Sequence, residues 1–338
     1  MIEFKNVSAS YDGELAVLRD VSFTVNDGDF VAFVGTNGAG KSTTMRLVNG
    51  LLKPTAGAVL IDGVPTGALK TSELARRIGF LFQNPDRQIC CATVREELLF
   101  GFRALGEEGP EAEARVDAVI ERFGFSPDAE PFLLNRGTRQ LLALASIIVL
   151  APPVIVLDEP TTGLDFRECE KVMAVVRELN EQGTTVIMVC HDMEVVGDFA
   201  DRVIAMTAGR VVADGLTFEV LRNPAVLAEA HILPPQITAI ALTLERELPA
   251  CPAPVAAANT VDAMADALAV ATTADAGAPA AERPDPAATP DRPEPATPGR
   301  DGAGMLDELE PDRSDQTAAP GRPAPAAVPD NPNAEGAR

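Results

Sequence analysis

A phosphate-binding loop constrains this chain more than any other feature of its sequence. Residues 35–42 read Gly-Thr-Asn-Gly-Ala-Gly-Lys-Ser and match the pattern G-x-x-x-x-G-K-[ST] in full. The five apolar residues 30–34 before the loop predict a buried strand, and residues 42–49 after it have helical character. A strand, a glycine-rich turn and a helix in this order predict an α/β fold with the loop at the end of the strand.

The residue types in the loop explain its chemistry. Glycines let the backbone curl so that several N–H groups face one anion, and a helix N-terminus adds about half a positive charge. Lys41 supplies a mobile charge for the β- and γ-phosphates, and Ser42 offers a hydroxyl to Mg²⁺. The loop therefore predicts binding of a purine nucleoside triphosphate together with Mg²⁺.

Strands and helices alternate along much of the chain. Apolar runs at 58–62, 154–157 and 186–189 predict strands, and the apolar positions of 167–182 share one helix face. Buried strands joined by helices predict a P-loop NTPase-type α/β fold with a mostly parallel sheet. We also expect an antiparallel β edge and a helical subdomain inserted at about 84–152.

Three polar side chains follow predicted strands. Asp158 at a strand end can hold Mg²⁺, and Glu159 can reach past the γ-phosphate and polarise an attacking water. His191 follows the strand 186–189, at the edge where open α/β sheets bind ligands, and can donate a hydrogen bond to the γ-phosphate. Alternatively, Asp158 and Glu159 are solvated acids at a strand exit and His191 is a structural residue. The complete phosphate-binding loop in the same chain favours roles in catalysis for all three.

Two further side chains leave the sequence more open. Tyr11 lies about thirty residues before Lys41 and can stack on adenine, although ordinary packing is equally compatible with its position. His231 has no comparable neighbours and is expected to be structural.

These motifs, in this order, resemble the ATPase subunit of ABC transporters over residues 1–271. Gln83 falls at the Q-loop glutamine, residues 162–165 resemble the D-loop, and the stretch LDEPTTGLD is highly specific. The resemblance implies catalytic roles for Glu159, His191 and Gln83, and Mg²⁺ ligands from Ser42, Gln83 and Asp158. The nucleotide-binding residues that it implies are Tyr11, Gly35, Thr36, Asn37, Gly38, Ala39, Gly40, Lys41, Ser42, Thr43, Asn135, Gly137 and Asp165.

Shorter motifs resemble one subgroup, the energy-coupling-factor ATPases of vitamin and cobalt or nickel importers. Residues 83–88 (QNPDRQ), 191–194 (HDME) and 233–238 (LPPQIT) are similar to that subgroup. The resemblance implies a second ABC ATPase subunit, identical or different, a membrane coupling protein that docks near 83–101, and a substrate-capturing membrane subunit. The chain would then lie at the cytoplasmic face of the cell membrane as a peripheral protein.

The signature motif departs from the family pattern. The family has Leu-Ser-Gly-Gly-Gln, whereas residues 134–138 read Leu-Asn-Arg-Gly-Thr. In the family this segment closes over the ATP of the opposite subunit, so we expect an asymmetric pair in which one site hydrolyses ATP slowly or only binds it. For the motif itself, the alternative is a change of sequence without functional effect. For the whole protein, the alternatives are an ATPase of another ABC transporter class, a weakly hydrolysing regulatory protein, or a soluble ABC ATPase of DNA repair or translation.

Charge and composition narrow these alternatives. The net charge of −22 argues against a protein that coats nucleic acid, because phosphate backbones require clustered Lys and Arg. The apolar run 141–157 is interrupted by Pro152 and Pro153, which favours a buried helix and strand over a membrane span. Five cysteines without a CxxC pair indicate a reducing cytosol, and the N-terminus predicts no signal peptide.

Composition also suggests where the chain divides. We expect an ATP-binding domain at 1–235, a small C-terminal extension at 236–271 and a disordered, acidic Ala/Pro-rich tail at 272–338. The tail contains 13 Pro and almost no large apolar residue, too little to offset chain entropy by burial. Residues 305–309 form its one helix-like island, a transient turn or a partner-docking motif.

Overall fold

A six-stranded sheet carries the phosphate-binding loop. In the computed structural model, which describes residues 1–13, 15–248 and 250–275, the strand order is β10-β9-β3-β8-β7-β6. Every neighbouring pair is parallel except β10 and β9, so the sheet is mostly parallel as predicted and its antiparallel pair lies at one edge. The strands are β3 (Phe30–Val34), β6 (Ile78–Leu81), β7 (Val154–Asp158), β8 (Thr185–Val189), β9 (Arg202–Thr207) and β10 (Arg210–Leu216).

Alternate residues of the central strands face two separate cores. In β3, Phe30, Ala32 and Val34 belong to one buried cluster, whereas Val31 and Phe33 belong to the other. Successive side chains of a strand point to opposite faces, so a strand covered on both faces must be apolar throughout. This explains the uninterrupted apolar runs that predicted β3, β7 and β8.

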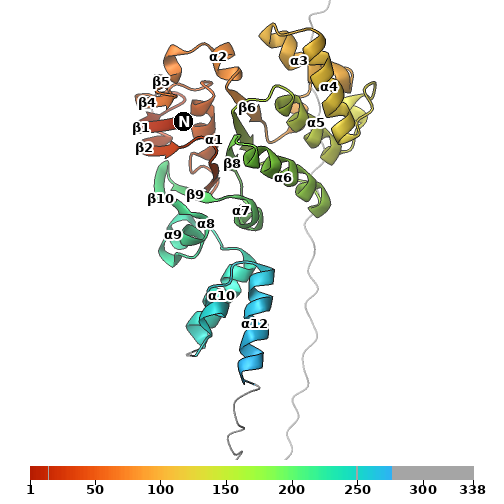
Figure 1. Ribbon diagram of the computed structural model, residues 1–338. Coiled ribbons are helices and arrows are strands. Elements are labelled where there is room, and N and C mark those ends of the chain that lie inside the picture. Colours follow the sequence, from red (N-terminus) through yellow and green to blue (C-terminus); the bar gives the residue numbers. More distant parts are fainter. Residues whose placement is uncertain (14, 249, 276–338) are drawn as a thin grey trace, which may run out of the picture. The chain divides into compact units, whose positions relative to one another are not determined.

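Helices cover one face of this sheet, and α1 with a second sheet covers the other (Figure 1). The inserted helices α3, α4 and α5 lie between β6 and β7 in sequence, and Thr93 begins α3 with a capping box that includes Glu96. The helices are α1 (Lys41–Val48), α2 (Thr71–Ala75), α3 (Val94–Leu105), α4 (Pro110–Phe123), α5 (Arg136–Ile148), α6 (Phe166–Glu181) and α7 (Met193–Phe199).

The second sheet is antiparallel, with strand order β2-β1-β4-β5. It contains the strand predicted at 58–62, which therefore does not join the parallel sheet. Its alternating burial and the Asp62-Gly63 turn give a hairpin with one exposed face, and this pattern distinguishes it from the fully buried strands. The strands are β1 (Ile2–Ala9), β2 (Leu18–Val25), β4 (Ala56–Ile61) and β5 (Val64–Pro65).

The apolar run 141–157 divides as the sequence predicts. It contains the end of α5, the two prolines and β7. Among the helices of the described residues, none has both the length and the apolar character that a membrane crossing needs.

The C-terminal helices form a third, small core. Its buried members come from α10, α12 and the α11 region, and Arg222 donates hydrogen bonds from the segment after α8 to Asn259 Oδ1 (2.9 Å) and the Ala256 carbonyl. The last helix continues to residue 275, past residue 272 where the tail was predicted to begin, because the Ala and Thr residues there do not stop a helix. The helix-like segment predicted at 305–309 lies outside the described residues. The helices are α8 (Thr217–Leu221), α9 (Pro224–Ala230), α10 (Gln236–Glu247), α11 (Ala253–Ala256) and α12 (Val261–Asp275).

Candidate functional site

The ends of four parallel strands bring the predicted site residues together. The phosphate-binding loop follows β3, Gln83 follows β6, Asp158 ends β7 and His191 follows β8. Asp158 is paired in register with Val189, two residues before His191. Because the carboxyl ends of parallel strands meet at one edge, residues far apart in sequence share one site.

The loop backbone is suited to an anion. Gly40 precedes α1 in a left-handed conformation and provides no side-chain cap, so the first N–H groups of α1 have no capping side chain. At Gly35 the φ of +135° already requires glycine, and an added Cβ would lie 2.1 Å from the Met206 carbonyl oxygen. A cavity of about 140 Å³ opens here, lined by Val17, Asn37, Gly38, Gly40, Lys41, Ser42, Thr43, Glu159 and His191.

Lys41 is held inside its own loop. Its Nζ donates hydrogen bonds to the carbonyl oxygens of Gly35 (2.7 Å) and Thr36 (3.0 Å), and the residue is only 5% exposed. Burial lowers the pKa of the Lys41 ammonium from its usual value, while the carboxylates of Glu159 and Asp158 act in the opposite direction. The ammonium thus lies among oxygens that triphosphate oxygens can replace.

Asp158 and Ser42 offer oxygens to a cation. The Ser42 hydroxyl donates to Asp158 Oδ1 at 3.4 Å, and both residues lie on the loop side of the sheet edge. Hydroxyl and carboxylate oxygens are the ligands that Mg²⁺ prefers, so the pair fits that ion. Burial raises the pKa of Asp158, and the neighbouring Glu159 carboxylate raises it further.

Glu159 is held by three side chains. Its Oε1 lies 3.0 Å from His191 Nε2, and its Oε2 accepts hydrogen bonds from Gln83 Nε2 (2.6 Å) and Thr162 Oγ1 (2.9 Å). Its backbone has a φ of 52°, a left-handed conformation that costs a non-glycine residue about 1–3 kcal/mol. The backbone N–H of Glu159 donates to the Val189 carbonyl (2.9 Å), which anchors the Glu159 backbone to the end of β8.

Tyr11 lies beside α1 with 54% of its surface exposed. Its hydroxyl is 3.1 Å from Thr43 Oγ1 and accepts a hydrogen bond from Arg46 (3.2 Å), whose guanidinium lies 5.7 Å from the ring centroid. These contacts fix the position of the Tyr11 ring, and its exposed surface is available to a nucleotide base. Sequence reasoning did not assign Arg46, although it lies one helical turn after Ser42 and so shares its face.

The signature residues 134–138 lie at the start of α5, and Gly137 there lies close to Glu168 in the first turn of α6. Asn135 Oδ1 accepts the Thr138 N–H (2.8 Å), and Arg136 donates to the Thr162 carbonyl (2.9 Å). A Cβ on Gly137 would lie 2.1 Å from Glu168 Oε1. Arg136 thus connects the altered signature segment to Thr162, one of the three residues whose side chains contact Glu159.

Asp165 and Thr162 complete this region. Asp165 Oδ1 accepts the Glu168 N–H (2.9 Å) in a capping box that begins α6. In the part of the chain that the structure describes, the side chains of Asn135 and Asp165 accept hydrogen bonds from their own helices, so their nucleotide contacts stay predictions. The sequence assigned Thr162 only to the D-loop. Its contact with Glu159, three residues earlier, depends on the left-handed backbone of Glu159, which the sequence pattern did not indicate.

The chain is similar to ABC transporter ATP-binding proteins in sequence. A family model described as ABC transporter matches residues 18–162. The energy-coupling factor transporter ATP-binding protein EcfA of Methanothermobacter thermautotrophicus is 38% identical over 240 residues, which cover 70% of this chain and 77% of that protein. A putative ABC transporter ATP-binding protein of Methanosarcina mazei is 39% identical over 248 residues, and the match spans 73% of this chain but only 42% of that relative.

The fold of this chain is similar to those of solved ATP-binding cassettes. The structure of cbiO1 from Clostridium perfringens, described as part of the ABC transporter complex cbiONQ, matches with a TM-score of 0.60 and 30% identity, over 73% of this chain and 95% of that one. A dimeric post-hydrolysis structure of the ATP-binding cassette MJ0796 bound to ADP and Pi matches with a TM-score of 0.57 and 33% identity, over 64% and 99% of the two chains.

The raised pKa of Asp158 predicts a stability cost. The folded chain holds a proton on this carboxyl to higher pH than an unfolded chain does, so ionisation destabilises the fold. The cost is absent below the unfolded Asp pKa of about 3.9 and complete above the raised folded pKa. We expect Asp158→Asn to raise the thermal unfolding midpoint at pH 7 without Mg²⁺ or nucleotide, with a gain that disappears towards pH 4.

The exposed Asp266 on α12 provides the control, since Asp266→Asn removes an acid of the same type outside the site. Thermal unfolding of both variants over this pH range checks the expectation. An unchanged or lower midpoint for Asp158→Asn at pH 7 would contradict it.

Proposed function

The chain belongs to the ABC transporter ATP-binding family, and from this membership we propose that it is the ATP-hydrolysing subunit of an energy-coupling-factor importer. The observation that carries the hydrolytic role is the Glu159 carboxylate, held by Gln83, Thr162 and His191 beside the phosphate-binding loop. The similarity to EcfA and to cbiO1, a part of the cbiONQ complex, supports the importer class.

Each residue has a defined task in this proposal. Lys41 and the first N–H groups of α1 bind the β- and γ-phosphates, which takes the Lys41 ammonium away from the loop carbonyls. Glu159 orients the attacking water and accepts its proton, and Gln83 and His191 respond to the γ-phosphate through their contacts with this carboxylate.

The remaining contacts orient the substrate and its ion. Ser42, Asp158 and Gln83 would hold Mg²⁺, and the ion would neutralise phosphate charge. Tyr11 stacks on adenine while Thr43 and Arg46 fix its hydroxyl.

The proposed assembly contains two ATPase subunits and two kinds of membrane protein. ATP binds between the subunits and draws them together, and closure moves a membrane coupling protein docked near 83–101. A separate membrane subunit captures the cargo, a vitamin or a transition-metal ion, and the chain lies at the cytoplasmic face of the cell membrane. The net charge of −22 supports a partner set without nucleic acid.

We further propose that the two ATP sites are unequal. The site closed by residues 134–138 of this chain has Asn, Arg and Thr where the family has Ser, Gly and Gln. Asn135 already uses its Oδ1 to cap α5, and the Arg136 guanidinium lies against Gly163. A partner subunit with an intact signature would close the efficient site, in which this chain supplies Glu159.

Removing the Glu159 carboxylate separates binding from hydrolysis. Glu159→Gln keeps the size of the side chain and one oxygen that accepts hydrogen bonds, but it removes the carboxylate that acts as the base. In the assembled complex we therefore expect phosphate release to fall about 10²-fold or more while ATP binding is retained. Phosphate release and nucleotide binding are measured on the same preparation, with the exposed Glu181→Gln as control. Phosphate release at the wild-type rate from Glu159→Gln would overturn the role of this residue.

Restoring the signature tests the inequality of the sites. We expect the triple variant Asn135→Ser, Arg136→Gly, Thr138→Gln, purified without other subunits, to hydrolyse ATP about tenfold faster or more than the unaltered chain. Adding Glu159→Gln to the triple variant should abolish the gain, which identifies it as hydrolysis at the proposed site. Rapid hydrolysis by the unaltered homodimer at both sites would refute the asymmetry.

A further inference from the structure

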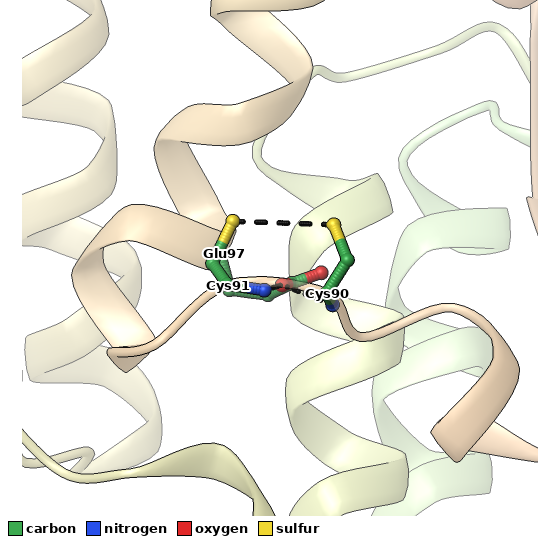
Figure 2. A group of neighbouring side chains, drawn as sticks. All are labelled: Cys90, Cys91 and Glu97. Carbon is green, nitrogen blue, oxygen red and sulfur yellow. Dashed lines mark hydrogen bonds between the residues drawn. The ribbon is translucent and has the colours of Figure 1, made fainter. Parts of the chain in front are cut away.

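A cluster of two cysteines and a glutamate lies outside the nucleotide site. Cys90 and Cys91 occupy the loop before α3, and Glu97 lies in the first turns of that helix. The Sγ atoms are 4.0 Å apart, and one ligand atom from each of the three residues lies within 4.8 Å of the others. Figure 2 shows both sulfurs on the same side of the loop, with the carboxylate between the two cysteines.

Glu97 fixes the position of the loop that carries the thiols. The residue is 3% exposed, and its Oε2 accepts the backbone N–H groups of Cys90 and Cys91, each at 2.9 Å. Both cysteines are therefore anchored to the start of α3 through one carboxylate. An arrangement fixed in this way avoids much of the entropy that a flexible loop would lose when its side chains are gathered around a ligand.

We propose that Cys90, Cys91 and Glu97 bind a thiophilic divalent metal ion of the Zn²⁺ type. Two sulfurs, each about 2.3 Å from a tetrahedral Zn²⁺, are about 3.8 Å apart, close to the 4.0 Å between these Sγ atoms. The two thiols lose their protons to solvent on binding, and one carboxylate oxygen is the third ligand. The fourth position stays open to water, and the exposed Cys90 gives the ion access from solvent.

The alternative chemistry for neighbouring cysteines is a disulfide, which the geometry does not favour. The sulfurs are nearly twice as far apart as the S–S bond of about 2.05 Å. The negative charge of the buried Glu97 carboxylate, beside the two sulfurs, attracts a cation.

The cluster is placed where an ion would affect the catalytic region. Its loop connects Gln83, which donates to Glu159, to α3 of the inserted helices. A bound ion would add a second attachment between the loop and α3, and binding to the folded chain alone raises its stability.

Metal titration of the full chain tests the site. Metal-free, reduced protein is titrated with Cd²⁺ as the spectroscopic probe and with Zn²⁺, and the readouts are the ultraviolet thiolate-to-metal absorption and the thermal unfolding midpoint. We expect one ion per chain with two thiolates bound, and a higher midpoint. The Cys90→Ser, Cys91→Ser variant loses both signals, whereas the control Cys169→Ser, Cys251→Ser, which removes the other two partly exposed thiols, keeps them.

Further variants separate the ligands. Glu97→Gln is expected to weaken binding about tenfold or more, and each single cysteine variant to halve the thiolate absorption per ion. Because Glu97 also anchors the loop, the single cysteine variants decide the outcome if Glu97→Gln does not fold. Asp158→Asn keeps the signal, which excludes the nucleotide site as its source. Equal Cd²⁺ affinity and absorption in the double cysteine variant and the unaltered chain would overturn the proposal.

Discussion

Parallel pairing of β3, β8, β7 and β6 is the constraint on which the rest of the site depends. It sets the carboxyl ends of four strands at one edge, where each strand is followed by a polar residue or by the phosphate-binding loop. The two buried clusters on either side of the sheet fix these strands, because each strand contributes alternate side chains to each cluster. The positions of Gln83, Asp158 and His191 thus follow from the packing of residues that do no chemistry.

Several residues of the site are in environments that cost folding free energy, and binding of the proposed substrate would offset part of that cost. Lys41 is buried against carbonyl oxygens, the pKa of Asp158 is raised by burial, and Glu159 has a left-handed backbone. In the proposed function, phosphate oxygens would replace the carbonyls around Lys41, and a cation beside Asp158 would compensate the charge of its carboxylate. Groups placed in advance in this way need little reorganisation during phosphoryl transfer, in which positioning and charge neutralisation are the main requirements.

Local patterns in the sequence predicted the elements that carry the site. The strands β3, β7 and β8 and the helices α1 and α6 lie within a residue or two of their predicted bounds, because apolar runs, glycines and periodicity are local signals. The sequence did not reveal that β4 joins a separate antiparallel sheet, because a short apolar run does not indicate which strand it pairs with. The contact of Arg46 with Tyr11 was missed because it joins segments 35 residues apart. The contact of Thr162 with Glu159 is local, but it depends on the left-handed backbone of Glu159, which the sequence pattern did not indicate. The Asp165–Glu168 capping box that begins α6 was not predicted either, although its sequence signal, an Asp followed three residues later by a Glu, is local.

The central claim is that loop 35–42 and the carboxylates of Asp158 and Glu159 form one pocket for magnesium-bound ATP. Calorimetric titration of Mg-ATP into the assembled complex tests it most directly, with Lys41→Ala as the comparison that removes the loop's charge. The account predicts saturable nucleotide binding that Lys41→Ala weakens at least about tenfold, the loss expected for a charged contact worth roughly 1.4 kcal/mol or more. No nucleotide uptake by the unaltered complex, or equal affinity in the variant, would contradict it.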